Sequence, residues 1–144
     1  MATKRINLEL QRLKNKNLTH IVYQPYENNI FNCWGMIEGP ENTPYQGGIF
    51  YVLIKLPLDY PFKNPKIYFM TKIFHPAVSE SGKICCNTVF DEWSPKNTIE
   101  YLLQLIWEHL KNPVCCCGVG ANLFKNDKNR FIQTAQQWTQ YYAN

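Results

Sequence analysis

A cysteine in an irregular, apolar stretch has the clearest chemical potential in this 144-residue chain. Cys85 lies in a segment, residues 73–95, that follows neither the period of a strand nor that of a helix. Turn signals interrupt this segment at His75-Pro76, Ser81-Gly82 and Ser94-Pro95. A long apolar loop in a compact domain is typically a functional loop held on a core. The residue types therefore permit a thiol nucleophile at Cys85, with help in ionising from Lys83 or His75, although a buried structural cysteine is the more common kind.

Two other kinds of cysteine chemistry fit less well. A cysteine protease needs a carboxyl or amide group that orients its histidine, and His75 has none close in the sequence. Zinc sites use Cys-x-x-Cys spacing, which the runs Cys85-Cys86 and Cys115-Cys116-Cys117 lack. The spacing therefore predicts no zinc site. A thiol-redox or metal protein stays open as an alternative on the cysteine runs alone.

The elements that must position Cys85 follow an α+β order. Residues 2 to about 16 predict an amphipathic helix, and residues 20–24, 31–38, 49–56 and 66–70 predict strands. The strand connections are too short for parallel crossovers, so we expect an antiparallel meander. Tyr60-Pro61 is a candidate cis bond. Helices are predicted from Ile99, capped by Asn97 or Thr98, to about Leu110, and over residues 128–142, with a buried face of Phe131, Ala135, Trp138 and Tyr142.

Composition limits the function classes. The length predicts one domain over residues 1–144. Net charge is only +4, and there is neither a phosphate loop nor a basic stripe with stacking aromatics, so nucleic acid is not an expected partner. No apolar run reaches membrane-spanning length and no signal peptide is evident, so we expect an intracellular protein with reduced cysteines. Basic residues crowd the first helix, a pattern of a solvated face or of an acidic partner: Lys4, Arg5, Arg12, Lys14 and Lys16.

With these motifs in this order, the chain resembles the ubiquitin-conjugating enzymes. The resemblance is carried by Ile-Phe-His-Pro at 73–76, Gly-Lys-Ile-Cys at 82–85 and Trp-Ser-Pro at 93–95. Further matches, in the same order along the chain, are residues 4–10, Gly39-Pro40, 44–48, 60–63 and 138–140. Catalytic-domain-only members that serve many RING ligases are the most similar subgroup. The resemblance implies the ubiquitin-conjugating fold: N-terminal helix, four-stranded antiparallel meander, active-site loop, central helix and C-terminal helix.

The resemblance also implies an acyltransferase. Cys85 would accept ubiquitin from an activating enzyme as a thioester and pass it to a substrate lysine or to a ligase cysteine, with no metal and no organic cofactor of its own. Its neighbours would be His75, Ala77, Asn87, Cys116 and Cys117. The family's ligase surface falls on Arg5, Phe62, Ser94, Pro95 and Lys96, and its activating-enzyme surface falls on Lys4 and Arg5.

Departures from the family pattern cluster around the cysteine. Ala77 stands where the family has the asparagine that follows His-Pro, which is credited with stabilising the oxyanion; alanine has no side-chain donor. Asn87 stands where close relatives have an aspartate that helps the attacking lysine. Cys116-Cys117 replaces an acidic loop, in which one thiol could form a disulfide with Cys85, and Val22 replaces a serine of a second ubiquitin site. Cys86 and Lys96 are also unusual at their positions.

Two readings of different classes follow. One is an active conjugating enzyme with altered transfer preference, working as a monomer in the cytoplasm or nucleus with ubiquitin, activating enzyme, a RING ligase (including one of the cysteine-relay kind) and protein substrates. The other is a catalytically impaired module of the same fold that binds ubiquitin or a RING ligase. The retained Cys85 favours the active enzyme.

Overall fold

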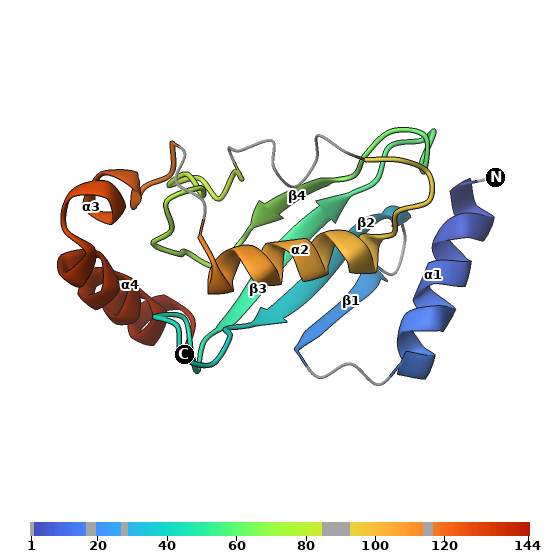
Figure 1. Ribbon diagram of the computed structural model, residues 1–144. Coiled ribbons are helices and arrows are strands. Elements are labelled where there is room, and N and C mark those ends of the chain that lie inside the picture. Colours follow the sequence, from blue (N-terminus) through green and yellow to red (C-terminus); the bar gives the residue numbers. More distant parts are fainter. Residues whose placement is uncertain (1, 17–19, 27–28, 85–92, 114–116) are drawn as a thin grey trace.

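The computed structural model describes residues 2–16, 20–26, 29–84, 93–113 and 117–144. A four-stranded antiparallel sheet in the order β1-β2-β3-β4 forms the centre, with β1 at Ile21–Tyr26, β2 at Asn29–Glu38, β3 at Ile49–Lys55 and β4 at Lys66–Phe69. The predicted meander is therefore confirmed. α2 (Ile99–Lys111) crosses one face of the sheet, and α1 (Ala2–Lys16) lies beside β1 (Figure 1). α3 (Ala121–Asn126) and α4 (Lys128–Tyr142) lie at the far end from α1 (Figure 1).

Period-2 alternation on the strands builds the core. On β3, Phe50, Val52 and Ile54 are fully buried, while Ile49, Tyr51 and Lys55 are exposed. The inward residues pack under the apolar stripe of α2, which consists of Ile99, Leu102, Leu103, Ile106 and Leu110. Because a strand alternates its side chains while a helix repeats every 3.6 residues, both patterns could be read directly from the sequence. None of the helices in the described part of the chain is long and apolar enough to cross a membrane.

Three predicted details are confirmed and three are wrong or missed. Tyr60-Pro61 is cis, Thr98 caps α2 by accepting from Tyr101 N at 3.0 Å, and α1 has the predicted bounds. The first strand does not end before Pro25, because Pro25 faces Cys33 at a position where β1 needs no N–H donor to β2. Tyr142 is 41% exposed, and Thr139 takes the expected inward place on α4. The short helix α3 was not predicted at all.

Candidate active site

The loop that leads to Cys85 is fixed to the edge strand β4. Phe69 N donates to Gly82 O at 2.8 Å, and isolated bridges join Tyr68 to Lys83 and Val78 to Ile84. Gly82 makes this approach possible, because its φ is +91° and a Cβ would stand 2.0 Å from Phe69 O. The structure therefore fixes the backbone of Ile84, the residue directly before Cys85.

A second segment, residues 118–120, holds the other side of the loop. Gly118 N donates to Pro76 O at 2.8 Å, Val119 N to Val78 O at 2.9 Å, and Gly120 N to His75 O at 3.1 Å. A Cβ on Gly118 would lie 2.5 Å from His75 O and from Val78 N, so only glycine permits this contact. The segment after α2 thus packs directly against the His-Pro motif, although more than forty residues separate them.

His75 is a positioning residue in this loop. It is 2% exposed, its Nδ1 accepts from Ala77 N at 2.9 Å, and its Nε2 lies 3.0 Å from His109 O. Because a carbonyl can only accept, Nε2 carries the proton, and both ring nitrogens are used. Burial lowers the pKa of His75 to about 4, so the ring is neutral at pH 7. The sequence-based suggestion that His75 helps to ionise Cys85 is therefore not favoured, since a base needs a free nitrogen.

The remaining predicted neighbours divide between described and undescribed residues. Ala77 is 7% exposed, so its side chain lies inside the loop, and Cys117 is exposed. Cys85, Cys86, Asn87, Cys115 and Cys116 lie outside the described residues, and the predictions about them stay predictions. Cys33 is a buried core thiol whose pKa is raised to about 11 by burial and by Glu9, which makes it a poor nucleophile. Within the described chain, no three His, Cys, Asp or Glu side chains group as metal ligands.

The predicted ligase surface is assembled from two loops. Trp93 Nε1 donates to Pro61 O at 2.8 Å and its ring lies 5.9 Å from that of Tyr60, which joins residues 60–62 to the segment before α2. Phe62 is 62% exposed beside this junction. Pro95 and Lys96 are exposed on the second loop, and Ser94 is half-buried. An exposed phenylalanine next to prolines has the chemistry of a protein-binding surface.

Arg5 is part of a buried network that the sequence did not reveal. Its Nε lies 3.0 Å from Glu9 Oε2, and its NH2 group donates to Asn97 O at 2.8 Å. Glu9 is 3% exposed and also accepts from Tyr60 Oη and from Ile99 N. Spacing Arg5 and Glu9 four apart on a helix indicates only a surface pair. Arg5 therefore positions α1 against both loops, whereas Lys4 is exposed and free of that network's contacts.

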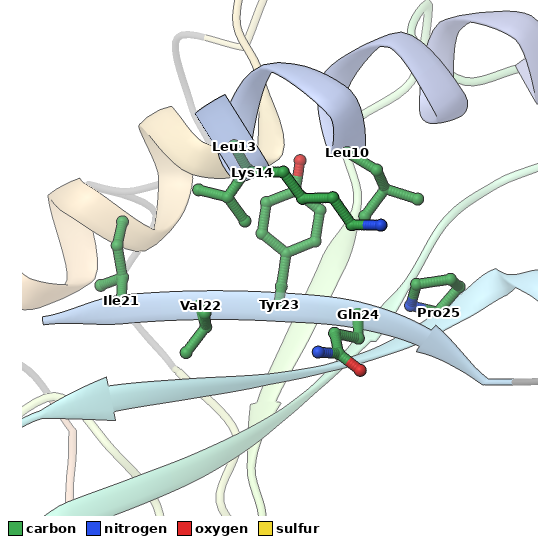
Figure 2. Close-up of a pocket in the computed structure, with 8 residues that line it drawn as sticks. All are labelled: Leu10, Leu13, Lys14, Ile21, Val22, Tyr23, Gln24 and Pro25. Atoms are coloured by element: carbon green, nitrogen blue, oxygen red, sulfur yellow. The ribbon is translucent and has the colours of Figure 1, made fainter. Parts of the chain in front are cut away.

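Two further surfaces lie away from the loop before Cys85. Val22 points to the outer face of the sheet, where its register partners are Met36 and, one strand further, Tyr51. A groove of about 460 Å³ runs between α1 and β1, lined from α1 by Leu10, Leu13 and Lys14 and from β1 by residues 21–25 (Figure 2). Neither surface was predicted as a catalytic one.

The fold and the anchored loop at residues 75–84 together define a class of protein. It is a small α+β protein in which a cysteine directly follows a residue held in a β-bridge. Comparison identifies the class, because residues 5–139 match the family model described as ubiquitin-conjugating enzyme. A crystal structure from Plasmodium yoelii, assigned as a ubiquitin-conjugating enzyme, is 37% identical with a TM-score of 0.93, covering 99% of this chain and 96% of that one. The E2 domain of a Toxoplasma gondii ubiquitin-conjugating enzyme is 34% identical with a TM-score of 0.92, and each chain is fully covered. The chain belongs to the ubiquitin-conjugating enzyme family, and the predicted fold is confirmed.

Proposed function

We propose that the protein accepts the C-terminal carboxyl group of ubiquitin on Cys85 as a thioester and transfers it to a second nucleophile. The observation that carries this proposal is the double anchoring of residues 75–84, by β4 on one side and by residues 118–120 on the other. An enzyme that hands over a large acyl group needs its nucleophile at a fixed place, since misplacement by about 1 Å can cost about 100-fold in rate. Family membership supports the identity of the acyl group.

Charging needs no base from this chain. The Cys85 thiolate attacks the thioester carbonyl that joins ubiquitin to the activating enzyme; a new C–S bond forms, and the activating enzyme's thiolate leaves. The attacking species is already deprotonated, so the step depends on the thiolate fraction and on access. This agrees with a His75 whose two nitrogens are both occupied.

Transfer to lysine is the more demanding step. The amine attacks the thioester carbonyl, negative charge develops on the carbonyl oxygen, Cys85 leaves as thiolate, and the amine loses a proton. The chain has Ala77 at the position of the family's oxyanion donor and Asn87 at that of its base. A ligase cysteine attacks as a thiolate, so it needs no base, and as a strong nucleophile it depends less on the oxyanion donor. We therefore propose that cysteine acceptors are favoured over lysine acceptors.

The exposed residues of the two predicted surfaces suggest the protein partners. Phe62, with Ser94, Pro95 and Lys96, is proposed to bind a RING-type ligase, and exposed Lys4 to contact the activating enzyme. Arg5 supports both surfaces from inside its network. The protein is proposed to work as one domain, as a monomer, in the cytoplasm or nucleus, without a cofactor of its own.

Incubation with activating enzyme, ATP and ubiquitin, followed by a non-reducing gel, tests the proposal. The expected product is a ubiquitin adduct that thiol reductants remove, and Cys85→Ser should give an adduct that resists thiols but is cleaved by hydroxylamine. An adduct that persists in Cys85→Ala would place the acyl group elsewhere. If no adduct formed although the protein still bound ubiquitin or a RING domain, the second reading, a catalytically impaired binding module, would replace the first.

A further inference from the structure

β1 is an edge strand, and its outer side pairs with no other strand among the described residues. Glu38 N donates to His20 O at 2.9 Å, and the register pairs Val22 with Met36 and Gln24 with Trp34. In an antiparallel ladder the hydrogen-bonded pairs alternate with non-hydrogen-bonded ones. The backbone N–H and C=O groups of Ile21 and Tyr23 therefore point away from β2. Within the described part of the chain, no backbone or side-chain group pairs with them on that side.

The opposite edge of the sheet differs. β4 is covered by the loop before Cys85, through Phe69 N to Gly82 O and the Tyr68–Lys83 bridge. Pro25 closes one end of the β1 edge, because proline has no N–H to offer. The available edge thus consists of the N–H and C=O groups of Ile21 and Tyr23 with the C=O of Pro25, which is the length of a short peptide strand.

The groove beside this edge has the volume and the apolar lining that such a strand requires. Its volume of about 460 Å³ lies between α1 and β1, and Figure 2 shows Leu10, Leu13 and Tyr23 between the helix and the strand. Tyr23 is 2% exposed, so its ring lies at the base of the groove and its hydroxyl is buried.

Charge decides which peptide fits. Lys14 is exposed and extends from α1 along the groove (Figure 2). Figure 2 labels no acidic side chain beside it, and none of the described residues that line the groove is a carboxylate. An acidic side chain on the incoming strand would meet the Lys14 ammonium, while its apolar neighbours would contact Leu10 and Leu13.

We propose that this edge groove binds an extended, acidic peptide segment of a partner protein, which adds to β1 as a fifth strand. Pairing of main-chain groups supplies the affinity in this mode, and pockets for alternate side chains supply the selectivity. The inference does not depend on the thioester chemistry of Cys85, so each can fail without the other.

Selection of random ten-residue peptides displayed on phage against the full chain provides the probe. Enriched peptides should carry an acidic residue among alternating apolar residues. In fluorescence polarisation, Lys14→Glu should weaken their binding at least about fivefold, because it places like charges together. Lys66→Glu, which reverses an exposed lysine on the opposite edge strand, should stay within about twofold. N-methylation of the peptide amides that pair should weaken binding at least about tenfold.

Amide hydrogen exchange supplies the second readout. In the free protein the amides of Ile21 and Tyr23 should exchange faster than those of Val22 and Gln24, which pair with β2. A saturating peptide should slow exchange at Ile21 and Tyr23 at least about tenfold. Absence of any enriched peptide, binding that is indifferent to Lys14→Glu, or unchanged exchange at these two amides would each overturn the proposal.

Discussion

The carboxylate of Glu9 on α1 accepts a hydrogen bond from the backbone N–H of Ile99 at the start of α2, at 2.8 Å. The other carboxylate oxygen accepts from Tyr60 and from Arg5 Nε, and Arg5 in turn donates to Asn97 O. A buried carboxylate is stable only when such donors surround it. Glu9 therefore connects the first helix to both loops that carry Phe62 and Pro95.

Replacing Glu9 by glutamine should destabilise the protein. The amide offers one acceptor oxygen and turns an NH2 group toward a donor, so we expect a loss of about 2–3 kcal/mol in the free energy of unfolding. Urea unfolding of Glu9→Gln measures this directly. Lys16→Gln, which breaks the more exposed Lys16–Glu100 pair, is the control and should cost less than about 1 kcal/mol. Equal losses in the two variants would contradict the role assigned to Glu9.

His75 should stay neutral well into the acid range. Its folded-state pKa is lowered to about 4 by burial, whereas the ordinary value is 6.5. The unfolded chain therefore binds more protons between these values, so the stability due to His75 is complete above about pH 6.5 and falls as pH drops toward 4. At pH 5 the loss from this group should be about 2 kcal/mol. Imidazole nitrogen shifts in NMR should show the Nε2–H tautomer at pH 5.5; a titration midpoint near 6.5 would refute the assignment.

Gly118→Ala should disturb the active-site loop. The new methyl group would meet the backbone at His75 and Val78, and overpacking of this kind costs about 1–3 kcal/mol. We expect slower charging of Cys85 at temperatures where the variant is still folded. Gly47→Ala is a matched control, because Gly47 has positive φ but open space around its Cα, so it should lose stability without slower charging. If both variants charged at the wild-type rate, contact with residues 118–120 would not matter for the site.

Phe62→Ala should separate binding from folding. The ring is 62% exposed, so its removal should change the free energy of unfolding by less than about 1 kcal/mol. A central aromatic residue commonly dominates a small interface, so we expect RING-stimulated discharge to fall about tenfold or more with charging unchanged. Tyr141→Ala, which removes an 81% exposed aromatic residue on α4, should leave both activities intact. Equal losses of charging and of ligase response in Phe62→Ala would indicate a structural role.

Ala77→Asn should speed transfer to lysine. A single oxyanion donor is worth about 2.7–4 kcal/mol in other enzymes. Because residue 77 is nearly buried and the amide must find room, we expect at least about a tenfold faster discharge to free lysine, equivalent to about 1.4 kcal/mol, with charging unchanged. Single-turnover discharge of the purified thioester measures the rates. A wild-type protein as fast toward lysine as Ala77→Asn would mean that another donor fills the role.

Local sequence patterns were sufficient to predict most helices and strands of this protein. Alternation on β3, the spacing on α2 with its Thr98 cap, and the ordered motifs around Cys85 predicted the elements, their antiparallel order and the family. These signals are readable because period, capping and turn chemistry act over a few residues.

Tertiary structure alone decided the rest, because those features depend on contacts between distant segments. Pro25 continues β1 because the strand is at the sheet edge there, and Tyr142 is exposed because Thr139 packs inward instead. His75 is neutral because its ring is buried, and Glu9 is buried because Tyr60 and Ile99 close over it. A sequence gives the type and spacing of such residues, but the partner that satisfies each polar atom is set only when the chain folds and desolvates it.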